Sequence, residues 1–375
     1  MKTRWEYLEF ADCIDKIVYT NKIKRKDFLA KGEYRIISQE ENYINGYWNA
    51  ETDLFKIIKP VVIFGDHTKN LKYIDFDFVL GADGVKIFQP IDCINTKYFY
   101  YFLKSVKLKD LGYARHYRLL KEIKVPLPPI PEQKRIVKIL DEAFAAIDKA
   151  KANAEKNLQN SRELFDSYLN KVFAPSAGVR LSSAEGSGQR NPGEDWEEKK
   201  LGECFKLKSG DGLTSKNMSR EGNIPVYGGN GIAGSHNEYN LSGSNVIVGR
   251  VGALCGNARH INENIWLTDN AFKIINFKYE FDNSFLTYLL NYTNLKSYAR
   301  QAAQPVISNS SLQDVKLHFP HFINEQKQIV KKLDGISSEL NKLETIYQQK
   351  LTDLEELKKS ILQKAFEGQL SIDNG

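Results

Sequence analysis

Three short patterns in the sequence use residue types that could bind a cofactor or a metal ion or catalyse a reaction. The glycines of YGGNGIAGSHN, Gly229, Gly231 and Gly234, satisfy GxGxxG. In a dinucleotide-binding site this motif joins a strand to a helix, and an acid follows about 20 residues later. Here Ser, His and Asn follow, and nothing resembles a helix. We therefore interpret the stretch as a loop whose backbone could approach a phosphate or a base closely.

The other two patterns are acidic. Asp110, Glu122 and Lys124 resemble the two acids and the lysine of a metal-dependent nuclease, but such triples are common by chance in a chain that is 27% charged. His236 and Glu238 form HxE, yet no PCxxC follows, so a zinc deaminase is not supported. The six histidines show no ligand spacing. We predict no catalytic residue and no metal site, and keep a Mg²⁺-dependent DNA-cleaving enzyme as an alternative.

Length and composition bound the remaining choices. A chain of 375 residues is too long for one ordinary core, so two or three domains are expected. No apolar run approaches the roughly 20 residues of a membrane span, and MKTRWEYLEF has no apolar signal-peptide core. The four cysteines lie far apart without a CxxC pair. These features predict a reduced, cytoplasmic protein without a disulfide framework.

The distribution of charge indicates a polyanionic partner. The net charge is +6, and residues 1–131 carry 22 Lys and Arg against 17 acids, whereas residues 325–375 carry 8 against 9. The basic excess therefore lies mainly in the first globular segment, as expected of a nucleic-acid-binding domain.

Basic and amide side chains with interleaved aromatics could contact DNA. KIKRKDFLAKGEYR (22–35) and KLKDLGYARHYRLLKEIK (107–124) are basic, and ARQAAQPVISNSS (299–311) offers types that pair with base edges. Lysines would mostly hold phosphates. The DNA-binding candidates are Lys24, Arg25, Lys26, Arg35, Arg115, Arg118, Lys121, Arg250, Asn257, Arg259, Arg300, Gln301, Gln304 and Asn309.

A repeated segment organises the chain. PPIPEQKRIVKIL and FINEQKQIVKKL place Glu132 and Glu325 193 residues apart, and the alignment from these residues to Phe173 and Phe366 needs no gap. Sixteen of its 42 positions are identical. Gap-free repetition favours a long helix, because an insertion would rotate one face away from its partner. We predict helices over 132–173 and 325–366, with the prolines before Glu132 stopping any earlier start.

Heptad spacing predicts that these helices pack on each other. In the second copy a main row recurs every seven residues, at Leu333, Leu340, Tyr347, Leu354 and Ile361. An offset row contains Ile336, Leu343 and Leu357 and is interrupted by Lys350 and Lys364. The pattern is weaker in the first copy, where the main row is Leu140, Ile147, Ala154 and Tyr168. Two independent amphipathic helices, each packed on its own domain, are the alternative.

The segments before the two helices also correspond. WEYLEFADC (5–13) matches WEEKKLGEC (196–204), FVLGADGVKIF (78–88) resembles WLTDNAFKIIN (266–276) as a strand pair, and YFYYFLKS (98–105) resembles SFLTYLLN (284–291) as a helix. The predicted order is a first domain (1–131), a helix (132–173), a Ser/Gly/Pro-rich linker (174–195), a second domain (196–324), a helix (325–366) and a tail (367–375).

This architecture resembles the specificity subunit of type I restriction-modification systems. The resemblance covers essentially the whole chain and is carried by PLPPIPEQKRIV (126–137), NEQKQIVKKLD (324–334) and, in support, SNVIVGRVGALCG (244–256). The proline run is reduced to Pro320 in the second copy.

The resemblance implies an α+β fold with two similar target recognition domains of mixed α/β structure. Two long helices would separate them as an antiparallel coiled coil, with pseudo-two-fold internal symmetry. Each domain would read one half of a bipartite, asymmetric site in double-stranded DNA, and the helices would set the unread spacer. The residues expected to serve the spacer helices and subunit docking are Glu132, Gln133, Lys134, Leu140, Ile147, Glu325, Gln326, Lys327, Leu333 and Leu340.

The same resemblance implies a non-catalytic subunit without a cofactor of its own. Two methyltransferase subunits would use S-adenosylmethionine, and restriction subunits would use ATP and magnesium. A specificity subunit of a related type IIB or BREX-like system is an alternative, and a coiled-coil scaffold without a DNA role is another. The sequence leaves the recognised bases, the spacer length and the docking faces open.

Overall fold

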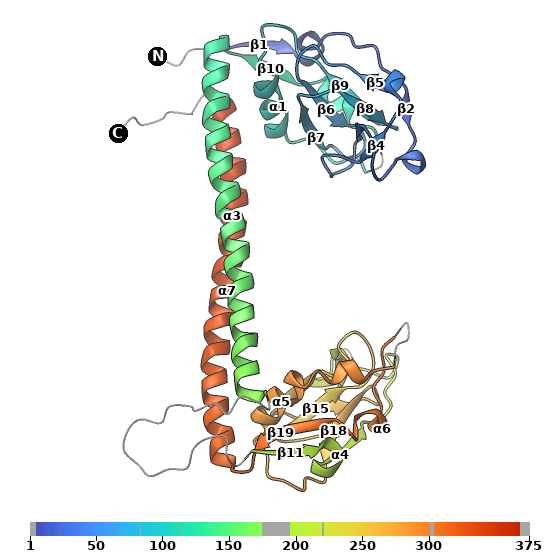
Figure 1. Cartoon of the computed structure of the whole chain (residues 1–375), viewed down its shortest axis with the longest axis vertical. Coiled ribbons are helices and arrows are strands. Elements are labelled where there is room, and N and C mark those ends of the chain that lie inside the picture. The colour runs from blue at the N-terminus through green and yellow to red at the C-terminus, as the bar shows by residue number, and fades with distance from the viewer. Residues whose placement is uncertain are drawn as a thin grey trace, which may run out of the picture. The chain divides into compact units, whose positions relative to one another are not determined.

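The computed structural model describes residues 5–82, 84–112, 114–174, 196–219, 221–300 and 304–367. The chain divides into two compact units (Figure 1). The first unit comprises residues 1–155 and 347–375, and the second comprises residues 156–346. The predicted linker beyond Ala174 and the predicted tail beyond Glu367 lie outside the described residues.

Two helices of 44 residues, α3 (Ile130–Phe173) and α7 (Ile323–Phe366), dominate the helical content. Both end at the predicted residues, but each begins two residues before the predicted Glu. The prediction that prolines exclude residues before Glu132 was wrong, because Pro131 is the second residue of α3. Proline is tolerated there since the first turn of a helix uses no backbone N–H within the helix.

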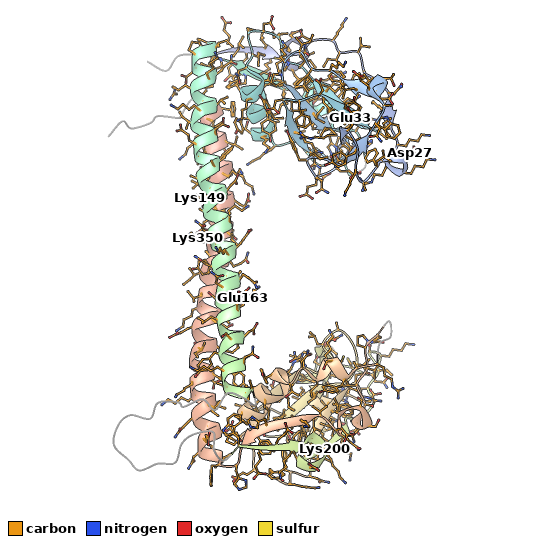
Figure 2. All side chains as sticks on the ribbon, in the orientation of Figure 1. Asp27, Glu33, Lys149, Glu163, Lys200 and Lys350 are labelled. Atoms are coloured by element: carbon orange, nitrogen blue, oxygen red, sulfur yellow. The ribbon has the colours of Figure 1, made fainter. Side chains whose placement is uncertain are left out.

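The helices pair antiparallel within each unit. In the first unit Asp148 accepts from Lys358 (2.8 Å), and Lys151 pairs with Glu355. Residue numbers therefore rise along α3 as they fall along α7. In the second unit the Nε of Arg162 lies 2.6 Å from Oε1 of Glu344. Polar side chains such as Lys149, Glu163 and Lys350 project from the paired helices (Figure 2).

The seam is narrower than the heptads predicted. Leu140, Ile147 and Leu333 are buried, but Leu343 and Leu357 of the offset row are 40% and 47% exposed. One partner helix covers only a narrow stripe of α7, and Leu343 and Leu357 lie outside that stripe.

The first unit contains three sheets. A strand pair joins β1 (Glu6–Glu9) to β10 (Lys124–Leu127). A three-stranded antiparallel sheet places β6 (Val61–Gly65) between β7 (Leu71–Ile74) and β9 (Val85–Phe88). All five residues of β6 are buried, because its two faces pack into different hydrophobic clusters. A mixed sheet contains β2 (Lys22–Ile23), β3 (Tyr34–Ile37), β4 (Gly46–Trp48), β5 (Leu54–Phe55) and β8 (Phe78–Gly81). Short helical turns are η1 (Phe10–Cys13), η2 (Arg25–Asp27) and η3 (Glu51–Asp53).

The second unit repeats this framework. Its strand pair is β11 (Trp196–Lys200) with β19 (Lys316–Pro320). The sheet of β12 (Lys206–Ser209), β18 (Ala271–Ile275), β15 (Asn245–Gly249) and β16 (Ala258–Ile261) places β15 between two antiparallel neighbours, as β6 is placed. A third sheet contains β14 (Gly231–His236), β13 (Ile224–Gly228) and β17 (Trp266–Leu267). In both units a hairpin strand pairs in parallel with a later strand, β3 with β8 and β13 with β17.

A short helix packs each framework on the long helices. α1 (Thr96–Ser105) is capped by Asn95, and α5 (Asn283–Tyr292) is capped by Asp282. The hydroxyl of Tyr101 donates to Asp141 (2.5 Å), and that of Tyr288 donates to Asp334 (2.8 Å). The remaining helices are α2 (Tyr117–Leu120), α4 (Leu201–Cys204), η4 (Leu295–Tyr298) and α6 (Asn309–Leu312).

A buried glutamine joins each long helix to the loop before the short helix. Gln133 has no exposed surface, accepts from Asn95 N (2.7 Å) and donates to Cys93 O (2.9 Å) and Pro128 O (2.8 Å). Gln326 is equally buried, accepts from Asp282 N (2.9 Å) and donates to Glu280 O and Pro320 O (both 3.1 Å). We call each set of three hydrogen bonds a glutamine clip. Both members of this pair serve the chain's own packing and have no surface for a partner.

We predict that Gln133→Leu destabilises the first unit alone. The change leaves the N–H of Asn95 and the carbonyls of Cys93 and Pro128 without this partner, and a buried group left without a partner costs about 1–3 kcal/mol. Hydrogen-exchange mass spectrometry should show faster exchange in peptides of the first unit, whereas Gln326→Leu should accelerate those of the second. The exposed neighbours offer a control, since Lys134→Ala and Lys327→Ala should change little. Equal acceleration of both units by either glutamine variant would contradict the assignment.

Candidate nucleic-acid interface

The turn that follows β6 gathers several loops of the first unit. Gln39 accepts from His67 N through its side chain (3.2 Å), and its carbonyl accepts from Thr68 Oγ1 (2.6 Å) and Asn70 Nδ2 (3.0 Å). The adjoining Glu40 pairs with Arg25. The segment with Lys24, Arg25 and Lys26, all exposed, therefore lies beside this turn.

A second basic segment reaches the same turn. Tyr117 N donates to Asp66 Oδ1 (2.7 Å), which places the exposed Arg115 and Arg118 on either side of this contact. Lys121 lies over the ring of Tyr117, with its Nζ 5.1 Å from the centroid. The structure thus brings together two basic segments that are about 90 residues apart in the sequence. Arg35 lies elsewhere, on β3 with its guanidinium over Phe76 (4.8 Å).

The loop beside the turn is held by a buried cation. Lys72 is 4% exposed and donates to Asn42 O (2.5 Å) and Asn45 Oδ1 (2.9 Å). Burial lowers the pKa of Lys72 to about 8, because desolvation disfavours its charged form. This lysine fixes the loop between β3 and β4 and is not available to a ligand.

In the second unit three candidates with different surroundings lie in the loop between β15 and β16 and at the start of β16. Arg250 is half-buried, donates from Nη1 to Asp269 O (3.1 Å) and lies over Phe272 (5.6 Å). Asn257 binds through its backbone to Gly249 and Leu254. Arg259 is half-buried on β16. Arg250 therefore braces the loop, which its sequence context did not indicate.

The remaining candidates of the second unit lie at positions 300–309. Arg300 N donates to Val306 O (3.0 Å). Arg300 and Gln304 are exposed. Gln301 lies outside the described residues. Asn309 is exposed but donates to Leu207 O (3.2 Å), which fixes the start of α6.

The glycine-rich stretch has a structural use that differs from the prediction. Residues 224–236 form the hairpin of β13 and β14, and so this GxGxxG does not join a strand to a helix. A Cβ at Gly229 would lie 1.9 Å from Val251 O, and one at Gly249 would lie 2.3 Å from Gly229 O. These glycines allow two loops of the same unit to pack backbone on backbone, and an approach to a phosphate is not what requires them.

Two members of the nuclease-like triple form ion pairs with other residues. Asp110 lies 3.1 Å from Lys69, and Lys124 lies 3.0 Å from Glu9. The N–H of Gly112 and the Lys69 ammonium lower the pKa of Asp110. Within the described ranges, no group of three or more His, Cys, Asp and Glu side chains could hold a metal ion.

At the start of the long helices the charged residues differ between copies. Glu132 forms a two-pronged pair with Arg135 (2.7 and 2.8 Å), whereas Glu325 accepts from Trp196 Nε1 (2.8 Å). Lys134 and Lys327 are exposed, and Leu340 is half-buried. Docking of a partner by these residues stays a prediction.

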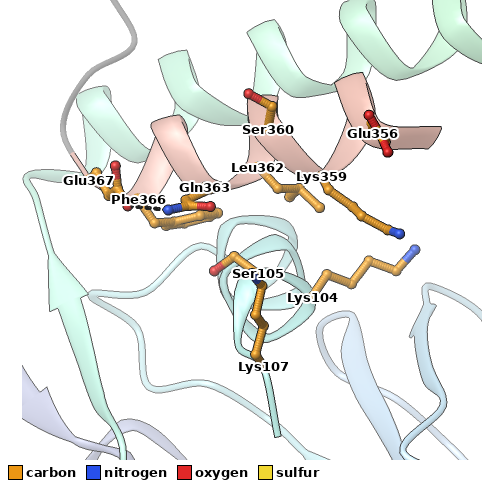
Figure 3. Close-up of a pocket in the computed structure, with 10 residues that line it drawn as sticks. All are labelled: Lys104, Ser105, Lys107, Glu356, Lys359, Ser360, Leu362, Gln363, Phe366 and Glu367. Atoms are coloured by element: carbon orange, nitrogen blue, oxygen red, sulfur yellow. Dashed lines mark hydrogen bonds between the residues drawn. The ribbon is translucent and has the colours of Figure 1, made fainter. Parts of the chain in front are cut away.

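A groove lies between the end of α1 and the end of α7 in the first unit (Figure 3). Its volume is about 910 Å³, and Leu362 and Phe366 are among its lining residues. The ammonium groups of Lys104 and Lys359 point toward one another at its rim (Figure 3). The second copy of the helix carries Lys359 where the first carries Asp166, so the repeat does not preserve this charge.

Sequence reasoning missed the residues that hold the loops. Asp66 and His116 are 2% and 0% exposed, although both lie in polar stretches of sequence that favour an exposed position. Their contacts join positions 50 residues apart, and no local pattern signals such a pairing. The only available hint was that Asp66 directly follows a buried strand.

Comparison with known proteins agrees with this architecture. The family model described as type I restriction modification DNA specificity domain matches twice, at residues 3–157 and 193–353. The chain belongs to this family. Each match covers one globular framework and part of a long helix, and the DNA candidates named above lie within the two matches.

Relatives carry the same family name. The specificity subunit of the type I restriction enzyme EcoprrI from Escherichia coli is 26% identical over 67% of this chain and 63% of its own length. The specificity subunit of EcoR124I/EcoR124II, also from E. coli, is 30% identical over 54% of this chain and 49% of its own length. The putative MjaX specificity subunit from Methanocaldococcus jannaschii is 24% identical over 96% and 84%. The chain thus aligns with only about half to two thirds of the E. coli relatives.

Solved structures share the fold. A chain from a study of complex assembly and conformational transition of the type I R-M system has a TM-score of 0.72 at 17% identity, covering 98% of this chain and 99% of that one. The HsdS subunit from Thermoanaerobacter tengcongensis has a TM-score of 0.53 at 18% identity, covering 98% and 97%. None of the described helices has the length and apolarity needed to cross a membrane.

We predict that Lys24→Ala with Lys26→Ala weakens binding of the chain to duplex DNA of random sequence. Both side chains are exposed beside the gathered loops, and lost phosphate contacts reduce the salt dependence of binding. The slope of log K against log salt should fall by about 0.9 for each lost contact. Lys56→Ala is the matched control, because its ammonium is already paired with Glu51 (2.9 Å). An equal effect of Lys56→Ala would contradict a local basic surface.

Proposed function

We propose that this chain is the DNA-recognition subunit of a type I restriction-modification complex. Each unit would read one half of a bipartite, asymmetric site in double-stranded DNA. The observation that carries the proposal is the repeated framework, in which both units share sheet pairings, the tyrosine–aspartate contact and the glutamine clip. A repeated framework with divergent loops suits a protein that makes one kind of contact twice with different base sequences.

The electrostatics support this role. The candidate residues of the first unit are all exposed Lys or Arg, and all but Arg35 gather around one turn. The second unit offers Arg300, Gln304 and Asn309, whose side chains suit guanine and adenine edges. Different side chains at corresponding loops predict different half-sites.

The partners belong to the same proposal. Two methyltransferase subunits would dock on the long helices, using S-adenosylmethionine, and restriction subunits would join with ATP and magnesium. The chain itself would bind none of these cofactors and catalyse no reaction. The groove of the first unit, with its apolar floor and lysine rim, is a suitable docking feature. A related type IIB or BREX-like system is the alternative, and neighbouring genes would distinguish it.

The continuous helices α3 and α7 would act as a ruler for the spacer. Four residues add about 6 Å to a helix, close to the rise of one to two base pairs. We predict that four residues inserted after Glu155 in α3 and before Leu351 in α7 lengthen the spacer and leave both half-sites unchanged. The measurement is genome-wide mapping of methylated adenines in a host expressing the chain with its methyltransferase.

The control places four residues in segment 175–195, where the spacer should not change. If unaltered chain and methyltransferase methylate no split site, the proposed function is wrong. If the site is split but both insertions leave the spacer unchanged, only the ruler is wrong.

A further inference from the structure

The arm of the first unit, residues 107–121, carries a concentrated positive charge. It contains five Lys and Arg against a single acid, Asp110, and all five basic residues are exposed. The acid is occupied by Lys69 (3.1 Å). The arm follows α1, contains α2 and includes Arg115 and Arg118.

A buried histidine closes the base of this arm. The backbone N–H of His116 donates to Asp66 O (2.8 Å), and Nδ1 of its ring lies 3.0 Å from the same carbonyl oxygen. Leu111 N donates to Nε2 (3.1 Å). A carbonyl can only accept, and Nε2 here accepts from an N–H, so the neutral ring carries its proton on Nδ1. The fully buried ring therefore bridges the two ends of the loop 111–116 and ties them to Asp66.

The carboxylate of Asp66 completes the attachment. Its Oδ1 accepts from Tyr117 N (2.7 Å), and the side chain is 2% exposed. The ring of Tyr117 packs against Phe88, with centroids 5.8 Å apart, and against Phe10 at 6.2 Å. Arg115 and Arg118 thus flank a point that is fixed to both the turn and the core.

The second unit makes backbone contacts at the corresponding point. Ile307 N donates to Arg250 O (3.0 Å), and Gly252 N donates to Pro305 O (3.0 Å). Asp66 and Arg250 each directly follow the glycine that ends an inner strand of a sheet, β6 or β15. Tyr-Ala-Arg precedes both attachments in the sequence, at 113–115 and 298–300, but the sequences that follow it differ.

We propose that Arg115 and Arg118 read bases of the first half-site, and that Asp66 and His116 are their positioning residues. An attachment that is repeated at corresponding strand ends lets each unit present different side chains from the same place on the framework. The proposal rests on the proposed function, and it assigns recognition of the first half-site to an arm oriented by a histidine that itself touches no DNA.

The test uses the full chain with its methyltransferase and a duplex carrying the site found by methylation mapping. Binding is compared for the correct site and for substitutions in either half, over a salt series. In His116→Ala, discrimination in the first half-site should fall roughly 10-fold or more while discrimination in the second stays unchanged. The salt slope should fall by about 1 to 2, because two basic side chains lose their fixed positions.

Three variants separate positioning from folding. Arg115→Ala with Arg118→Ala should reproduce the loss, and adding His116→Ala to it should cause little further change. His116→Asn keeps a side-chain N–H for the Asp66 carbonyl and should restore part of the discrimination. Gln133→Leu destabilises the same unit away from the arm and should leave both discriminations intact at low temperature.

Retained first-half discrimination in His116→Ala would overturn the inference alone, as would equal losses in His116→Ala and Gln133→Leu. Failure of the unaltered chain to bind any site specifically would overturn the proposed function, and this inference with it.

Discussion

The rest of this structure depends on a buried amide at the start of each long helix. Gln133 and Gln326 have no exposed surface, and each side chain binds one backbone N–H and two carbonyls. A glutamine side chain suits this role because it presents a donor and an acceptor on one planar group. The clip makes the first turns of the helix and the loop before the short helix one rigid body. A helix held in this way keeps a defined direction relative to the strands beside it.

The two units use this rigidity in the same manner. Aromatic side chains of the long helices complete the cores, as Phe366 packs on Tyr98 (5.3 Å) in the first unit and Phe173 packs on Phe285 (5.6 Å) in the second. Each helix therefore begins in one unit and ends within the core of the other. The loops that carry the DNA candidates are fixed to this framework, as Tyr117, beside Arg118, packs on Phe88 (5.8 Å) in the first unit. Exposed side chains on such loops can change without disturbing the core, as a specificity protein requires.

Much of the fold followed from one sequence feature. The 193-residue repeat predicted both helices, their ends and the correspondence of α1 with α5, since gap-free repetition is a strong constraint on a helix. The start of α3 was missed by two residues because proline was treated only as a helix breaker, and the start of α7 was missed equally because it was set by alignment with α3. Leu343 and Leu357 were placed in the seam because heptad spacing does not say how wide a stripe one partner covers.

The site was less predictable than the fold. Composition identified basic segments correctly as exposed, but it could not indicate that residues 24–26 and 115–118 lie at one turn. Arg250 braces a loop, which its place among glycines did not indicate, and its contact with DNA stays a prediction. Gln133 and Gln326 were predicted to serve the spacer helices and subunit docking, and their burial leaves no surface for docking. The sequence did not indicate these contacts, because side-chain burial depends on contacts between distant positions.

The central claim is that each of the two units recognises one half of a split DNA site. Hydroxyl-radical footprinting of the full chain with its methyltransferase, on a duplex carrying its methylated sequence, tests this most directly. The account predicts two protected patches separated by a spacer whose base sequence can be changed without loss of binding. One continuous protected patch, or loss of binding on changing the spacer sequence at constant length, would contradict it.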